Sequence, residues 1–160
     1  MDLTQLQEDY ELRFAELKRE IRHLAWLLEG RENGGEGLSG AQMQVLQAVR
    51  TSTCNFGAST DVLSKAFVSD AGTVCGVLMV QGYANSGGAN IKFNVKVNDT
   101  LVPPYYHTAF SGDFNEMFVF NASVPAGTNQ VLLNVERTGN TAYSYANGVK
   151  MIIFAPGQGL

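Results

Sequence analysis

The stretch IKFNVKVN, residues 91–98, decides the fold class of this 160-residue chain. Its four apolar residues alternate with lysine and asparagine, so every second side chain is apolar. Successive side chains of a β-strand point to opposite faces, and this pattern is therefore typical of a strand that buries one face. The Asn98-Asp99 pair favours a turn. The sequence thus predicts a half-buried strand that ends in a turn near residue 98.

The same period of two extends over residues 60–160. Pro103 and Pro104 exclude a central strand at their positions, and Asn147-Gly148 is a strong hairpin-turn signal. About eight short strands without an intervening helical pattern predict an antiparallel sandwich or barrel. The expected strands are VLSKAFVS (62–69), TVCGVLMVQGYA (73–84), IKFNVKVN (91–98), LVPPYYHTAF (101–110), NEMFVFNASV (115–124), QVLLNVERT (130–138), YSYA (143–146) and VKMIIFA (149–155).

Some residues of this β-domain are expected in its core. Phe114, Phe118 and Phe120 belong to one regular strand, and we assign all three to the core. Cys75 lies inside the apolar run TVCGVLMV, which indicates a small buried residue. Because Cys54 is the other cysteine of the chain, neither a disulfide framework nor a zinc site is expected.

Residues 1–29 follow a different period, with apolar residues three and four positions apart. This heptad pattern is typical of a coiled coil, and we expect the partners to be identical helices from other copies. The alternative is an amphipathic helix that lies on its own β-domain, but the long glycine-rich linker over residues 30–40 weighs against it. The expected stalk contacts are Tyr10, Phe14, Leu17, Ile21, Leu24 and Leu28, whereas Leu12 and Trp26 fall on the outer face and suit a different partner.

Residues 41–59 form a lead-in segment between this linker and a head domain over residues 60–160. The stretch SGAQMQVLQAVR, residues 39–50, has a capping-box spacing at Ser39 and apolar residues three apart from Met43. These features suit a second short helix, and an extended lead-in is the alternative.

The charge of the chain is unevenly distributed. Residues 1–38 carry five basic and nine acidic side chains, whereas residues 39–160 carry six of each. A neutral head without a basic stripe argues against nucleic-acid binding. The head is rich in Asn, Ser, Thr and Gly, which suits either an exposed particle surface or an adhesin, or a surface covered in part by other subunits. No signal peptide and no membrane insertion are expected.

Catalysis is not expected from the side chains available. The two histidines, His23 and His107, are not part of a Gly-x-Ser-x-Gly elbow or a comparable motif. The six acidic residues of the head show no spacing that singles out a catalytic pair. SGDFNE, residues 111–116, clusters oxygen ligands without the spacing of an EF-hand loop. We therefore expect neither an enzyme nor a bound metal or cofactor.

Binding is better supported, because two stretches concentrate four of the six tyrosines. PPYYHTAF and TAYSYANG fall near expected loops or strand edges, where a flat ring with a hydroxyl suits a carbohydrate or a protein surface. The alternative is that these tyrosines pack inside the sandwich or between subunits. The candidate glycan-binding residues are Tyr105, Tyr106, His107, Tyr143, Tyr145 and Asn147.

The arrangement of a heptad stalk, a glycine-rich hinge and the run VPAGTNQVLLNVERTGNTAYSYANGVKMIIFAPG (124–157) resembles the small trimeric fibre, spike or baseplate proteins of tailed phages. Their heads are jelly-roll sandwiches similar to the C1q and tumour-necrosis-factor fold. The resemblance implies a homotrimer on the surface of a virion, made in the host cytoplasm, with the stalk facing other virion proteins and the head outward. It leaves open whether the head adheres to a host or environmental glycan, or is a structural decoration of the capsid or baseplate.

Overall fold

The computed structural model describes residues 11–19, 21 and 42–157, with the backbone alone at residues 104–107. The chain divides into two compact units, residues 1–40 and 41–160. In the first unit, residues 11–19 and 21 are helical, and no helix in the described part of the chain is long and apolar enough to cross a membrane. Leu12 is exposed and Phe14 is buried, whereas Leu17 and Ile21 are intermediate. Tyr10, His23, Leu24, Trp26 and Leu28 lie outside the described residues, and coiled-coil association stays a prediction.

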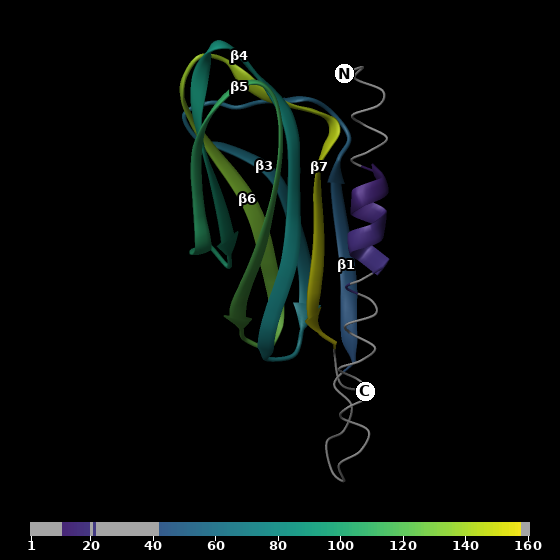
Figure 1. The fold of residues 1–160 in the computed structure, drawn as a ribbon. Coiled ribbons are helices and arrows are strands. Elements are labelled where there is room, and N and C mark those ends of the chain that lie inside the picture. The colour runs from purple at the N-terminus through teal and green to yellow at the C-terminus, as the bar shows by residue number, and fades with distance from the viewer. Residues whose placement is uncertain (1–10, 20, 22–41, 158–160) are drawn as a thin grey trace. The chain divides into compact units, whose positions relative to one another are not determined.

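The second unit consists of seven antiparallel strands (Figure 1). The hydrogen-bonded order is β1-β7-β4-β6-β3, with β2 paired to β7 and β5 paired to β4. The strands are β1 (Met43–Arg50), β2 (Cys54–Asn55), β3 (Thr60–Ser69), β4 (Gly72–Val97), β5 (Thr100–Val124), β6 (Gly127–Gly139) and β7 (Ala142–Pro156).

The long hairpin of β4 and β5 belongs to both layers of the domain. Residues 75–84 of β4 pair with β7, and residues 89–97 pair with β6. Between these halves the β4–β5 register is interrupted from Ala84 to Ala89, where Gly87 and Gly88 have φ values of 103° and 81°. The hairpin bends there, at the top of Figure 1. We call the layer with β1, β2, β7, residues 72–84 of β4 and residues 112–124 of β5 the β1 sheet. The layer with β3, β6, residues 89–97 of β4 and residues 100–110 of β5 is the β3 sheet.

The core between the two sheets is aromatic. Phe93 of the β3 sheet lies 5.1 Å from Phe118 and 6.4 Å from Phe114, both in the β1 sheet, measured between ring centroids. Phe56, just after β2, closes the group at 6.5 Å from Phe93. Phe114, Phe118 and Phe120 are all buried, which confirms their assignment to the core. The mainly-β class and the antiparallel sandwich are thereby confirmed.

Two local predictions about the β4–β5 hairpin are confirmed. Asn98 and Asp99 have φ values of 49° and 62° and join Val97 to Thr100, as in a two-residue turn of the primed type. Pro103 and Pro104 lie in β5, which among the described strands pairs with β4 alone. The outer edge of a sheet tolerates proline because no ladder hydrogen bond is lost there.

The prediction of separate short strands is wrong at three places, since six expected strands merge into β4, β5 and β7. NSGGAN, residues 85–90, is a bend within β4 rather than a loop between strands. Asn147-Gly148 is not a hairpin turn, because β7 continues through it while the β4–β7 register shifts between Val80 and Gly82. A Cβ at Gly148 would lie 2.6 Å from the Gln81 carbonyl oxygen, so the glycine allows the two backbones to approach.

Two further expectations need correction. The helix proposed for residues 39–50 is wrong, because residues 43–50 form β1, in which Leu46 and Ala48 pack against the core. The sheet thus begins before residue 60, because the backbone groups of residues 43–50 form hydrogen bonds with β7. Cys75 is exposed and is not a core residue. The side chain of the preceding residue, Val74, points into the core, so that of Cys75 points to the opposite face of the strand.

Candidate functional site

Three tyrosines of the β1 sheet form a cluster near the bend of the hairpin. Tyr143 of β7 lies opposite Tyr83 of β4, with ring centroids 5.9 Å apart and planes tilted by 37°. Tyr145 lies two residues further along β7, and its ring meets that of Tyr143 edge to face at 5.8 Å. A spacing of two places both side chains on one face of a strand. We call Tyr83, Tyr143 and Tyr145 the tyrosine cluster.

A carboxylate fixes one end of this cluster. The hydroxyl of Tyr145 donates a hydrogen bond to Oδ1 of Asp113, and Asp113 lies opposite Tyr83 in the β4–β5 register. Partial burial, followed by the hydrogen bond and the negative charge of Asp113, raises the pKa of Tyr145 well above its usual value. Tyr145 therefore stays protonated at neutral pH and remains a donor to the carboxylate.

The surroundings of the cluster combine apolar rings with polar groups. All three tyrosines are half-buried, so part of each ring remains accessible. Asn147 is exposed and has a φ of 59°, which a non-glycine residue adopts uncommonly and asparagine most readily. Accessible ring faces beside a carboxylate and an amide can bind a ligand that has both apolar faces and hydroxyl groups.

The structure separates the two tyrosine-rich stretches of the sequence. The backbone of Tyr106 lies opposite Phe93 and that of His107 opposite Lys92, in the half of β4 that pairs with β6. Tyr143 lies opposite Tyr83, in the half that pairs with β7. The stretch of Tyr105, Tyr106 and His107 therefore belongs to the β3 sheet, and Tyr143, Tyr145 and Asn147 belong to the β1 sheet.

Sequence reasoning missed Tyr83 of the cluster and Asp113, the carboxylate beside it. Tyr83 stands at the end of an apolar run, and Asp113 stands in SGDFNE, which indicated only a weak resemblance to a calcium loop. Their contacts with β7 depend on the pairing of strands about 60 and 30 residues apart in the chain. Among the described residues, no group of three His, Cys, Asp or Glu side chains is arranged to hold a metal ion.

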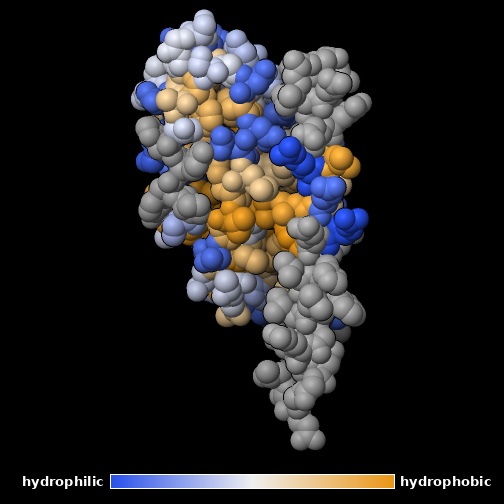
Figure 2. Space-filling model, viewed as in Figure 1, coloured by the Kyte–Doolittle hydropathy of each residue, from blue (hydrophilic) through white to orange (hydrophobic). Residues whose placement is uncertain are grey.

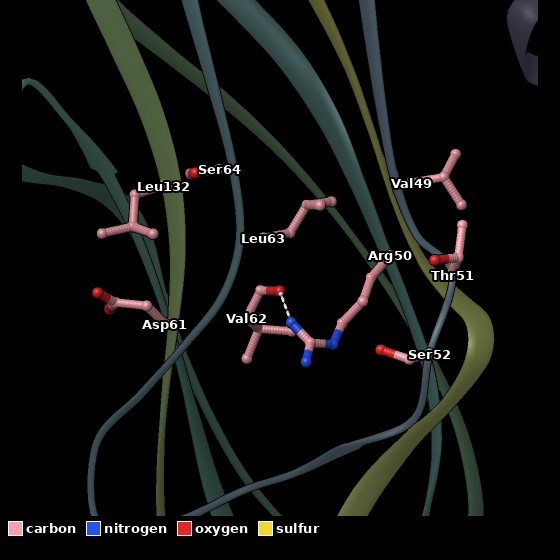
Figure 3. Close-up of a pocket in the computed structure, with 9 residues that line it drawn as sticks. All are labelled: Val49, Arg50, Thr51, Ser52, Asp61, Val62, Leu63, Ser64 and Leu132. Atoms are coloured by element: carbon pink, nitrogen blue, oxygen red, sulfur yellow. Dashed lines mark hydrogen bonds between the residues drawn. The ribbon is translucent and has the colours of Figure 1, made fainter.

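A separate hollow of about 440 Å³ lies where the end of β1 approaches β3 (Figure 3). Arg50 Nη1 donates to the Val62 carbonyl oxygen at 2.8 Å, while its Nε is buried without a hydrogen-bond partner. Asp61 also lines the hollow, and its Oδ1 accepts a hydrogen bond from Asn134 Nδ2 at 2.7 Å. The lining of the hollow thus includes a guanidinium and a carboxylate. Neither Arg50 nor Asp61 was predicted from the sequence to be a binding residue. The remaining lining residues are Val49, Thr51, Ser52, Leu63, Ser64 and Leu132.

No family model matches the chain, and no curated protein matches it in sequence. Among solved structures, it is similar to dimeric latent PorU from Porphyromonas gingivalis, with 11% identity and a TM-score of 0.48 over 76% of this chain and 13% of that chain. The chain is also similar to murine APRIL, with a sequence identity of 9% and a TM-score of 0.48. That match covers 71% of this chain and 99% of the APRIL chain. A family 35 carbohydrate binding module from Clostridium thermocellum has 12% identity and a TM-score of 0.40 over 70% and 98% of the two chains. These likenesses do not identify a ligand for this chain.

Proposed function

We propose that this chain is a non-enzymatic surface appendage of a phage virion, whose head binds a neutral glycan at the tyrosine cluster. The observation that carries the proposal is the arrangement of Tyr83, Tyr143 and Tyr145 beside Asp113. Tyrosine rings offer an apolar face to the C–H groups of a sugar ring, and their hydroxyls bond to sugar hydroxyls. An ionised carboxylate has acceptor sites beyond the one that Tyr145 occupies, so Asp113 can also accept from a sugar.

The position of the cluster within the head supports an adhesive role. Met43, the first residue of β1, lies opposite Pro156 at the end of β7, so the linker enters the head there. The tyrosine cluster lies at the other end of β7, which begins at Ala142. A ligand at the cluster is therefore bound away from the point where the head joins the linker.

The remaining parts of the chain suit a stalked appendage. We propose that the heptad pattern of residues 1–29 holds three copies together, with Phe14, Leu17 and Ile21 facing the trimer axis. Leu12, which is exposed, would then contact other virion proteins together with Trp26. The head carries equal numbers of basic and acidic residues, which suits a neutral ligand.

The full chain on a glycan array tests this function. We expect binding of at least one neutral glycan, lowered tenfold or more by Tyr143→Ala or Tyr145→Ala, because each change removes a stacking face. Tyr105→Ala and Tyr106→Ala are matched controls, since these residues belong to the other sheet. Unchanged glycan binding by Tyr143→Ala and Tyr145→Ala would contradict a site at the tyrosine cluster. If Tyr105→Ala and Tyr106→Ala alone abolished binding, the site would lie in the other tyrosine-rich stretch.

A purely structural role is the second candidate, with the head packed on other virion proteins. It is favoured by Met117 and Val119, which are exposed on the sheet that also carries the tyrosine cluster. Tyrosine nitration distinguishes the two roles. Tyr143 and Tyr145 that react in the purified protein but not in assembled particles would support the structural role, and a folded chain that binds no glycan would point the same way.

A further inference from the structure

A β-bulge shapes one wall of the hollow between the end of β1 and β3. The β3–β6 register shifts between Asp61 and Leu63, so Val62 is an extra residue of β3 without a partner in the ladder. A bulge leaves the extra residue unpaired, and bulges are frequent next to active sites. The carbonyl oxygen of Val62 is thereby free to accept the hydrogen bond from Arg50 Nη1.

The bond to Val62 holds the guanidinium of Arg50 at the hollow and leaves most of its donors unused (Figure 3). A guanidinium has five N–H donors, and Nε of Arg50 is buried without a hydrogen-bond partner. Within the described parts of the chain, no carboxylate forms an ion pair with Arg50. A buried donor without a partner calls for an explanation, such as a bound ion. Arg50 therefore offers a positive charge and free donors to a ligand in the hollow.

Other residues that line the hollow supply hydrogen-bond acceptors. Asp61 is exposed, and its Oδ1 accepts from Asn134 Nδ2 at 2.7 Å. An ionised carboxylate has further acceptor sites, and the carboxylate of Asp61 points away from Arg50 in Figure 3. The hydroxyls of Ser52 and Ser64, which can both donate and accept, also line the hollow. The lining therefore matches a ligand that has one negative charge and several hydroxyl groups.

We propose that the hollow is a second ligand site, which binds a small hydroxy acid. The carboxylate of the ligand pairs with Arg50, whose planar guanidinium matches two carboxylate oxygens, and the ligand hydroxyls bond to Asp61 and the serine hydroxyls. Leu63 and Leu132 give the carbon chain an apolar wall. The volume of about 440 Å³ lies within the roughly 300–1,000 Å³ of small-molecule sites. Sulfate fits less well, because it has no hydroxyl group to donate to Asp61.

The hollow is distinct from the tyrosine cluster and from the entry of the linker. The described residues that line it include none of the three tyrosines. Figure 2 shows hydrophobic residues gathered over β5, β4 and β7, with hydrophilic residues at the ends of the head. β1 follows this distribution, because Val45 is exposed within the strand and the polar residues 50–52 lie at its end. The linker enters at Met43, at the other end of β1. A hydroxy acid can thus bind without occupying the proposed glycan site.

Calorimetric titration of the full chain with gluconate tests the chemistry of the ligand. Sorbitol has the same carbon chain with hydroxyl groups and no carboxylate, whereas sulfate has negative charge and no hydroxyl groups. We expect saturable binding of gluconate, at least tenfold tighter than the binding of either control compound. Equal affinity for gluconate and sorbitol would overturn the proposal, because Arg50 would then contribute nothing. Equal affinity for gluconate and sulfate would also overturn it, because the site would then bind any anion.

Variants of the full chain then locate the site. Arg50→Gln removes the charged donor and should weaken gluconate binding tenfold or more. Lys65→Gln is the matched control, since Lys65 is a cation of β3 that is not among the lining residues, and it should leave binding unchanged. Tyr145→Ala should also leave it unchanged, so this site and the glycan site can fail separately.

A measurement on the wild type covers the case in which thermal melts show that Arg50→Gln does not fold. The backbone amide signals of residues 50–52 and 61–64 are followed by nuclear magnetic resonance during the gluconate titration, and we expect them to shift. Unchanged signals at millimolar gluconate, or equal effects of the Arg50 and Lys65 variants, would overturn the proposal.

Discussion

Phe93 and Phe118 pack with their ring centroids 5.1 Å apart, although one belongs to the β3 sheet and the other to the β1 sheet. Phe93 also contacts Phe56, Phe110 and Phe114, so it connects the two halves of the hairpin with the segment after β2. It is 1% exposed, and its ring fills the space between the layers. The packing of the two sheets thus depends on one central aromatic residue.

Phe93→Ala is expected to destabilise the head by about 3–5 kcal/mol, because it removes buried apolar surface and leaves a cavity. Urea unfolding followed by circular dichroism measures the change. Val68→Ala, at an exposed position of β3, should change stability by less than about 0.5 kcal/mol. Similar losses for both variants would contradict the central role of Phe93.

The conformation of Asp99 in the β4–β5 turn leads us to expect that two substitutions of this residue affect stability differently. Asp99 has a φ of 62°, a conformation that glycine adopts freely and β-branched residues adopt at a cost. Asp99→Val should therefore lower the free energy of unfolding by about 1–2 kcal/mol, whereas Asp99→Gly should leave it unchanged or slightly higher. Thermal unfolding of the two variants side by side is the measurement, and an equal effect of both would argue against the turn.

The hydrogen bond from Tyr145 to Asp113 leads us to expect that the stability of the head depends on pH. Burial and Asp113 raise the pKa of Tyr145 in the folded state, so the neutral phenol contributes stability below the unfolded pKa of about 10. This contribution is lost as the pH rises above that value. At pH 8, Tyr145→Phe should have a lower urea midpoint than the wild type, and the gap should narrow above pH 10. A gap that stays constant with pH would contradict the coupling.

The close approach of β4 and β7 at Gly148 leads us to expect that a side chain at this position would disturb the tyrosine cluster. A Cβ at this position would lie 2.6 Å from the Gln81 carbonyl oxygen and 3.0 Å from that of Tyr145. Gly148→Ala should therefore push β7 away from β4, lower stability by about 1–3 kcal/mol, and weaken glycan binding. Thermal melts and the glycan array measure these two effects. Normal binding by the destabilised variant would show that the cluster tolerates the displacement.

The sequence predicted the class of fold and part of its core well. The alternation of IKFNVKVN and the phenylalanines of β5 indicated strands and an inward face, because each signal lies within a few consecutive residues. The turn at Asn98-Asp99 was predictable for the same reason. Whether a glycine ends a strand or bends it depends on pairing with distant strands, so the merging of β4, β5 and β7 was not predictable.

The error at Cys75 has an instructive cause. TVCGVLMV is apolar at nearly every position, since Val74 and Leu78 belong to the core between the sheets, while Val77 and Met79, which are also buried, point to the opposite face of the strand. A run that is apolar on both faces loses its period of two, and its inward side then cannot be assigned from the sequence. The same limit applies to the tyrosine cluster, because Tyr83 and Asp113 approach β7 only through long-range pairing.

The hairpin shared by the two sheets also constrains how the head unfolds. Each sheet takes one half of β4 and one half of β5, so neither layer has a complete set of strands without the other. Partial opening of one sheet would expose the aromatic core of both. The head should therefore lose its structure in one all-or-none transition, with slow folding because most of its pairings join residues far apart in the chain.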